Sequence, residues 1–148
     1  MHTSFSRTLF VSLITATMAC THAGPSAGTP PGSGQTGPTN PALRDHAFLA
    51  DLYADTYYPP HLLDACKAVF VDLCRAIETQ RPQDLPALYA LTHRATERLN
   101  DLQLAFEENG SELETVAREA FGAEFQYIAT AYGFPDADVE ELIAPREW

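Results

Sequence analysis

The chain has 148 residues, with 9 Lys and Arg against 20 Asp and Glu, a net charge of −11 and three cysteines. This length corresponds to one domain, which can fold without a metal or a disulfide framework. All 20 acidic residues but only eight basic ones lie from Arg44 onward, so this part carries a charge near −12. Such a charge disfavours binding to nucleic acid or anionic lipid surfaces. It favours a basic protein partner, a cationic ligand or metal ions, unless it serves solubility alone.

Residues 1–20 resemble a bacterial lipoprotein signal peptide. Arg7 supplies a positive charge, residues 9–19 form an apolar stretch, and the small residue Ala19 precedes Cys20, the expected lipidation site. We therefore expect an exported lipoprotein that faces the periplasm or cell surface and touches the membrane only through its lipid. The alternatives are a simple cleaved secretory signal, or a start codon placed too far upstream, which would leave the protein cytoplasmic.

Residues 21–42 consist almost entirely of Gly, Pro, Ser, Thr, Ala, Gln and Asn. Such a segment cannot bury enough apolar surface to fold, so the sequence predicts a disordered tether. The remaining residues, 43–148, are expected to form the folded domain.

Two helices are predicted in the first half of this domain, over about 43–55 and 61–80, from apolar residues at helical spacing. Pro60 or its neighbour opens the second helix, since a first-turn residue needs no backbone N–H. The apolar stripe of the second helix contains Cys66 and Cys74. Eight residues span about 12 Å along a helix, too far for a disulfide, so we predict two buried free thiols.

A third helix is predicted over 85–108, with Asp84 as its N-cap and apolar residues spaced as in a helical bundle. The left-handed conformation that Gly110 readily adopts ends it. Ser111 and Glu114 have the spacing of a capping box, which predicts that a fourth helix starts at Ser111.

The fourth helix is predicted to continue to Tyr132, with Gly133 as its cap. A short helix follows from Asp136 to Ile143 and is stopped by Pro145. No strand-like alternation occurs in the sequence. The predicted fold is therefore all-α: a small bundle of four main helices plus a short C-terminal helix.

Three polar residues recur every four positions along the third helix: His93, Glu97 and Asp101. They share one side of the helix, where they could bind a metal or perform acid–base chemistry. No His-Glu-x-x-His or Glu-x-x-His signature accompanies them. Their angles from the apolar seam favour a solvated face instead, with a His93–Glu97 contact and with Arg94 or Arg98 near Asp101.

Glu124 falls close to the apolar seam of the fourth helix, so we expect it to be partly buried. A carboxylate there needs an Arg, His or Tyr hydroxyl as a partner. A structural role, bonded to a neighbouring helix, is the commoner case, and an acid–base role is the alternative. Cys66 or Cys74 acting as a nucleophile with His93 is disfavoured, because apolar stripes limit thiol reactivity.

Several separated stretches resemble the bacterial domain-of-unknown-function family 5713, over about Phe48 to Trp148. They are YYPPHL at 57–62, LTHRATE at 91–97, NDL at 100–102, EENGSE at 107–112 and LIAPREW at 142–148. The resemblance implies a helical domain of this length and brings no activity, cofactor or partner with it. Its members look like cytosolic proteins without a leader, which would account for unpaired thiols, whereas the leader and tether here depart from that pattern.

Two functional hypotheses follow. The acidic surface and the lack of a catalytic signature favour a non-enzymatic, membrane-tethered module that binds a basic protein partner, for example an immunity-like protein that neutralises a toxin. The alternative is a metal-assisted or acid–base enzyme that uses His93, Glu97 and Asp101 together with Glu124 or a carboxylate from the early fourth helix. We predict no cofactor, no resident metal and no nucleic-acid partner.

Overall fold

The computed structural model describes residues 37–148, and within this range it contains helices and no strands. Three helices are long: α3 (Pro60–Gln80), α4 (Leu85–Asn100) and α6 (Thr115–Ala131). Four are short: α1 (Pro41–Arg44), α2 (Ala50–Tyr53), α5 (Gln103–Glu108) and α7 (Val139–Leu142). The predicted all-α class is thus confirmed.

The predicted signal peptide, its Cys20 and most of the predicted tether lie outside the described residues. Within residues 37–148, no helix has the length and apolar character needed to cross a membrane. The end of the segment that composition assigns to the tether is part of the fold, since α1 begins at Pro41 and Asn40 caps it with its side chain.

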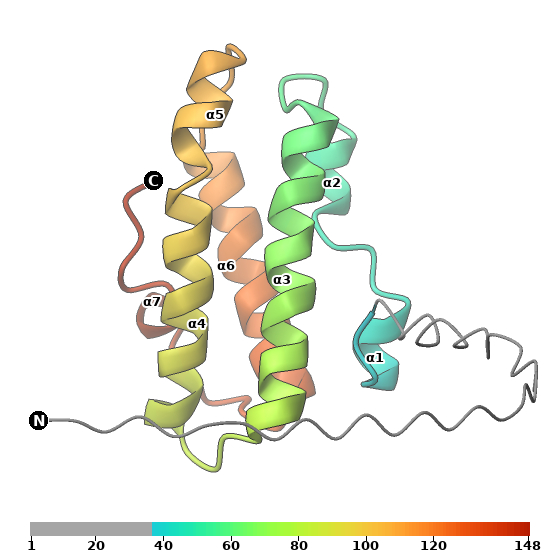
Figure 1. The fold of residues 1–148 in the computed structure, drawn as a ribbon, viewed down its shortest axis with the longest axis vertical. Helices are drawn as coiled ribbons and strands as arrows, with labels where there is room; N and C mark the ends of the chain where they lie inside the picture. The colour runs from blue at the N-terminus through green and yellow to red at the C-terminus, as the bar shows by residue number, and fades with distance from the viewer. Residues whose placement is uncertain (1–36) are drawn as a thin grey trace, which may run out of the picture. The chain divides into compact units, whose positions relative to one another are not determined.

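The three long helices form the body of the domain (Figure 1). Helices α3 and α4 lie side by side, and α6 packs behind them, while α5 extends beyond the end of α4. Helices α1 and α2 lie on the α3 side, where α2 contacts both α3 and α6. On the opposite side α7 contacts α6 and α4, so α6 has a short helix along each of its flanks.

The first predicted helix, over 43–55, differs from the structure, which has two one-turn helices, α1 and α2, joined by a non-helical link. Leu49 at the start of α2 adopts a left-handed conformation with φ 60°, which interrupts any continuous helix. The carboxylate of Glu124 on α6 accepts the Leu49 N–H at 2.7 Å and so holds this conformation. The bundle therefore has three main helices instead of four.

The third predicted helix, over 85–108, is divided into α4 and α5. Next to the break, the Leu102 N–H bonds to the Leu99 carbonyl three residues back, which tightens the turn locally. The side chain of Asn100 turns to the C-terminal segment instead, where it donates to the Pro145 carbonyl and accepts from the Glu147 N–H. The contact joins residues more than 40 positions apart, so no local pattern indicates it.

The predicted capping box is wrong. Helix α6 begins at Thr115, its N-cap Glu114 makes no side-chain capping bond, and the buried Ser111 hydroxyl has no hydrogen-bond partner among the described residues. The Ser111 N–H instead bonds to the Phe106 carbonyl, and the Gly110 N–H to the Glu107 carbonyl. This pair of bonds is the Schellman motif that closes α5, so Ser111 belongs to the end of one helix and not to the start of the next.

Other predicted helix ends are confirmed. Helix α3 starts at Pro60, and the Asp84 carboxylate accepts the Ala87 N–H at 2.9 Å as the N-cap of α4. Gly110 and Gly133 both have positive φ, 73° and 92°, where they end α5 and α6. Helix α7 is shorter than predicted, because Asp138 and not Asp136 caps its first turn.

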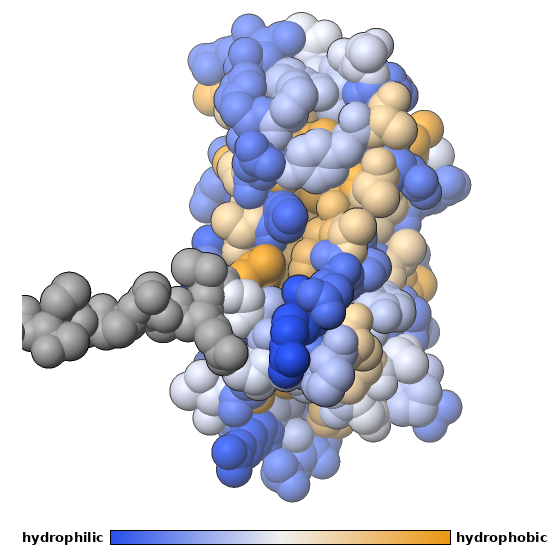
Figure 2. Space-filling model, turned by 90° about the vertical axis from the view of Figure 1, so that its right-hand side faces the viewer, coloured by the Kyte–Doolittle hydropathy of each residue, from blue (hydrophilic) through white to orange (hydrophobic). Residues whose placement is uncertain are grey.

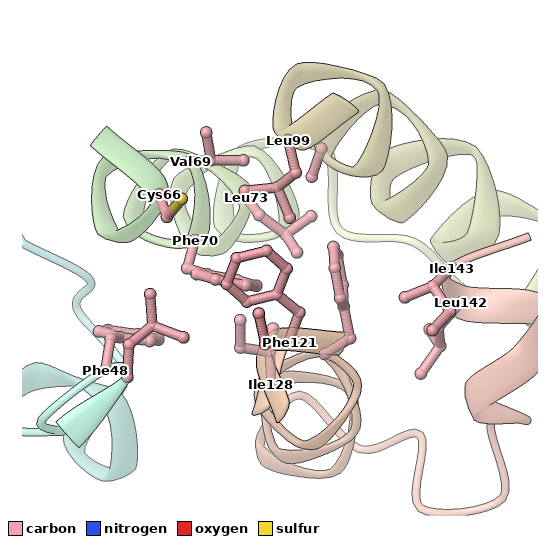
Figure 3. Close-up of a cluster of buried hydrophobic side chains, with 14 of the residues drawn as sticks. Phe48, Cys66, Val69, Phe70, Leu73, Leu99, Phe121, Ile128, Leu142 and Ile143 are labelled. Carbon is pink, nitrogen blue, oxygen red and sulfur yellow. The ribbon is translucent and has the colours of Figure 1, made fainter. Parts of the chain in front are cut away.

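Phe70 of α3 lies at the centre of the core (Figure 3). Its ring packs against Phe125 at 5.2 Å and Phe121 at 5.8 Å from α6, and against Phe48 at 6.1 Å from the link before α2. All four rings are almost fully buried. Burial of such side chains contributes about 2–3 kcal/mol each, so this aromatic cluster fixes α6 and the N-terminal link against α3.

Cys66 and Cys74 are both fully buried on the inner side of α3 and form no disulfide, as predicted. Burial raises the pKa of each thiol to about 12. A thiol that stays protonated and has no solvent access is a poor nucleophile. The two cysteines therefore pack as small apolar residues of the core.

Candidate functional site

The structure places His93 against α7. Its Nε2 lies 2.7 Å from the backbone carbonyl oxygen of Glu141, and its ring stacks on that of Tyr89 with centroids 6.3 Å apart. The half-buried imidazole is thus held between two helices. The contact with Glu97 that the spacing favoured is replaced by this longer-range one.

Glu97 and Asp101 are exposed on α4 and on the turn that follows it. Arg98 pairs with Asp72 of α3 at 3.0 Å, and not with Asp101. Across residues 37–148, no group of three or more His, Cys, Asp or Glu side chains is arranged to hold a metal ion. The three residues therefore share a helix face without converging on a common point.

Glu124 is only 8% exposed, which confirms its predicted burial, and two partners hold its carboxylate. One oxygen accepts the N–H of Leu49, and the other lies 2.7 Å from Nε2 of His46. His46 was not predicted as this partner; it falls within the predicted helix over 43–55 but lies between α1 and α2 in the structure. The only available signal was indirect, namely that a buried carboxylate on α6 requires a His, Arg or Tyr partner.

The His46 ring lies between aromatic neighbours. It stacks on Tyr127 with centroids 4.5 Å apart and meets Phe48 edge-on at 4.6 Å. Its side chain remains 25% exposed, so one side of the ring faces solvent. This cluster joins the segment before α2 to the outer face of α6.

Three adjoining shallow clefts run along that outer face of α6. The largest, about 390 Å³, lies between α6 and α7, with apolar walls from Gly122, Ala123, Val139 and Ile143. A second, about 290 Å³, lies between α6 and α2, and a third, about 210 Å³, between α6 and residues 46–51. Ala123 lines all three, so the clefts adjoin one another along α6, and we call them together the α6 groove.

The groove is apolar along its floor. Ala120 and Ala123 lie in its middle, Val116 is 55% exposed at one end, and Tyr127 is 42% exposed one turn beyond Ala123. Figure 2 shows the side of the domain that carries α1 and α2, where hydrophobic residues gather across the middle, with hydrophilic residues above and below. A helix face of this kind, open to solvent between two short flanking helices, is typical of an interaction surface.

Carboxylates dominate the charged residues of the groove. Glu140 pairs with Arg146 at 2.8 Å, whereas Asp51 and Glu119 have no ion-pair partner within the described range. Arg118 is the one Lys or Arg among the residues that line these clefts, and its Nε donates to the Trp148 carbonyl at 3.2 Å. The groove therefore combines an apolar floor with free negative charge.

The chain matches the sequence model of a family described as a family of unknown function, DUF5713, over residues 42–148. The chain belongs to this family. The match confirms the resemblance seen in the separated sequence motifs. No curated protein and no solved structure matches the chain significantly.

The DUF5713 match covers every helix except the first residue of α1, and it includes all residues that line the α6 groove. The groove is thus part of the family's own domain. The description of DUF5713 names no activity, so the chemistry of this chain's surface is the basis for a functional proposal.

A second carboxylate holds residues just before the DUF5713 match. One oxygen of Glu78, near the end of α3, accepts the N–H groups of Thr39 at 2.7 Å and Asn40 at 2.9 Å and the hydroxyl of Tyr132 at 2.7 Å. Burial opposes ionisation of Glu78, but these three hydrogen bonds outweigh it and hold the pKa of Glu78 below its usual value. Burial and the bond to Glu78 together raise the pKa of Tyr132.

Proposed function

We propose that this DUF5713 domain is a non-enzymatic interaction module that binds a basic protein partner at the α6 groove. The observation that supports the proposal is the combination of an exposed apolar floor with the carboxylates of Asp51 and Glu119, which have no ion-pair partner among residues 37–148. An apolar surface supplies affinity on burial, and unpaired charges at its edge select a partner of opposite charge. An immunity-like protein, which binds and neutralises a toxin, is one form of such a module.

The charge of the whole domain favours the same partner. A net charge near −12 over 105 residues produces a negative field that speeds the approach of a basic protein and repels an acidic one. At about 0.1 M salt this field is screened within roughly 10 Å, so binding at the groove should weaken as salt is added.

The enzyme alternative receives less support from the arrangement of its residues. The His93 imidazole is engaged with a backbone carbonyl on α7, while Glu97 and Asp101 face solvent. Glu124 makes its contacts with His46 and Leu49 on the other flank of α6. Acid–base catalysis needs such groups within hydrogen-bond reach of one substrate, and this arrangement separates them.

Photo-cross-linking in the cells that produce the protein tests the proposal. A photoreactive residue is placed at position 123 of the full chain, with position 90 on the exposed side of α4 as the matched control. We expect one basic protein to be cross-linked from 123 and not from 90. The purified pair should then lose about tenfold in affinity between 50 and 500 mM salt. A neutral or acidic partner, equal cross-linking from both positions, or an affinity that salt does not change would contradict the proposal.

We also propose that Cys20 is lipidated and that the module acts at a membrane surface. The support comes from the signal-like residues 1–20 and the Gly- and Pro-rich segment that follows them. Labelled palmitate should enter the wild-type chain and not Cys20→Ser, as measured by autoradiography of the isolated protein. Equal labelling of both chains, or no labelling of either, would contradict lipidation at Cys20.

A further inference from the structure

We infer that the partner inserts an amphipathic α-helix into the groove, parallel to the long direction of α6, with Lys or Arg side chains along its edges; this inference rests on the proposed function. Its small or apolar residues would face Ala120 and Ala123. Its cationic side chains would reach Asp51 beside α2 and Glu119 of α6, which lines the clefts on both sides of that helix.

The backbone chemistry of the groove favours a helix over an extended peptide. A peptide that binds as an added strand needs the free N–H and C=O groups of a sheet edge, and residues 37–148 contain no strand. The α6 backbone is occupied by its own helical hydrogen bonds, so the groove offers side-chain contacts only. A polyproline segment needs a groove lined by several aromatic rings, whereas the middle of this floor is made of alanines. An amphipathic helix, which satisfies its own backbone, is the remaining common mode.

The size of the groove fits a short helix. It extends from Val116 to Gln126, and ten residues of α6 span about 15 Å, the length of nearly three helical turns. Two helices pack with their axes about 8–10 Å apart, and the closer distance requires small residues at the contact. Ala120 and Ala123 provide these at the middle of the groove.

Helix α7 already packs on the neighbouring side of α6 through a small residue. A methyl group added at Gly122 would lie 3.4 Å from Cγ2 of Val139 and 3.8 Å from Cδ1 of Ile143, so α7 sits directly on this glycine. Ala123, the next residue of α6, is exposed to solvent on the side of the helix next to the one that α7 covers. The same helix therefore accommodates one short helix and has an open place for a second.

The negative charge argues against a second copy of this chain as the occupant. Two copies would bring together two domains of charge near −12, each with carboxylates at the groove, and like charges at an interface cost affinity. The same carboxylates would instead attract a helix from a basic protein. The chemistry thus selects a different, cationic partner.

Three synthetic peptides test the inference with the full chain. The first is a helical peptide of about 15 residues, roughly the groove's length plus one turn, with Ala and Leu on one face and Lys along both edges. The second differs from the first only by a central Pro, which breaks the helix, and the third replaces Lys by Glu. We expect the first to bind, measured by fluorescence anisotropy, at least about tenfold more tightly than the other two.

Matched variants locate the binding. Ala123→Gln keeps the helix propensity but fills the groove, and it should weaken binding of the lysine peptide by about tenfold, whereas Ala90→Gln on α4 should change it by less than about twofold. Glu119→Gln should cost about threefold and the exposed Glu97→Gln less than about twofold, as expected for single surface charges.

The outcomes separate the inference from the proposed function. If both lysine peptides bind equally and Ala123→Gln weakens both, the result would support a basic partner at the groove and contradict the inference that this partner binds as a helix. If the helical lysine peptide does not bind, or Ala123→Gln leaves its affinity unchanged, the docking of a helix is overturned, while cross-linking from position 123 still judges the proposed function. Self-association of the chain that Ala123→Gln abolishes would assign the groove to a second copy and overturn the inference.

Discussion

Glu124 shows how one buried side chain determines the path of a distant segment. Leu49 is held at φ 60°, a conformation that costs a residue with a side chain about 1–2 kcal/mol, yet its own side chain is only 2% exposed. The hydrogen bond to Glu124 and the burial of the leucine together outweigh this cost. The same carboxylate positions His46, so the wall of the α6 groove depends on one residue of α6.

Removing the Glu124 carboxylate should destabilise the domain. In Glu124→Ala the Leu49 N–H and the His46 imidazole lose their partner, and an unsatisfied buried group costs about 1–3 kcal/mol. We expect a loss of about 2–3 kcal/mol in the free energy of unfolding, measured by urea denaturation. Glu124→Gln retains an acceptor for the Leu49 N–H and should lose about 1 kcal/mol or less. Equal losses in the two variants would show that the hydrogen bonds do not hold the segment.

Glu78 makes a pH-dependent contribution to stability. Its pKa is lowered in the folded state, so its stabilisation is present above the usual carboxyl pKa of about 4.3 and is lost as the pH falls through the lower folded value. Glu78→Gln should reduce the free energy of unfolding by about 1 kcal/mol at pH 7, since the group is partly exposed. The difference from wild type should shrink below about pH 4.

The control for this pH experiment is Glu97→Gln, at an exposed position of α4. It should leave the free energy of unfolding within about 0.5 kcal/mol of wild type at every pH. A Glu78→Gln difference that stays constant from pH 7 to pH 3 would mean that the carboxylate charge has no part in binding Thr39 and Asn40.

At the level of the helices, the positions of small residues determine which substitutions are tolerated. A methyl group at Gly122 meets Val139 and Ile143 at ordinary contact distances, so Gly122→Ala should raise the free energy of unfolding by about 0.5–1 kcal/mol through helix propensity. At Gly133, where φ is 92°, an alanine should lower it by about 1 kcal/mol. Thermal unfolding measures both. A destabilising Gly122→Ala would mean that α7 packs too closely for any side chain.

Local sequence chemistry was enough to predict those helix ends that are determined by residues nearby in the sequence. Pro60 begins α3 because its first-turn position needs no N–H. Asp84 caps α4, and Gly110 and Gly133 close α5 and α6, through bonds between residues at most five positions apart. Ser111 was misassigned because a serine followed by Glu114 suits a helix start, while its N–H was needed to close the preceding helix. The start of one helix and the end of the preceding one were both compatible with the local sequence. The backbone bonds to Phe106 and Glu107 show that Ser111 belongs to the end of α5.

Long-range contacts account for what local patterns could not predict. The break before α2 depends on Glu124, 75 residues away, and the contact of His93 with α7 joins residues 48 positions apart. Burial of Glu124 could be predicted from its place on the helical wheel, but not that His46 would be its partner. The groove was also unpredictable, since exposed alanines on α6 carry no signal until the flanking helices are in place.

For the whole molecule, acidity and shape point to one surface. The charge near −12 is distributed over residues 43–148, and the α6 groove combines an open apolar floor with two carboxylates that have no ion-pair partner among residues 37–148. The cluster around Phe70 fixes α6 against α3, so this surface is presented by a rigid helix (Figure 3). Rigid presentation lowers the entropy cost of binding a partner.

NMR chemical-shift mapping of the labelled full chain during titration with the lysine-edged helical peptide tests the central claim most directly. The account predicts that the largest amide shifts fall on residues 116–127 of α6 and on the flanking α2 and α7, and that α4 residues 90–98 shift little. The largest shifts on the α4 face around His93 and Glu97, with α6 unchanged, would contradict it.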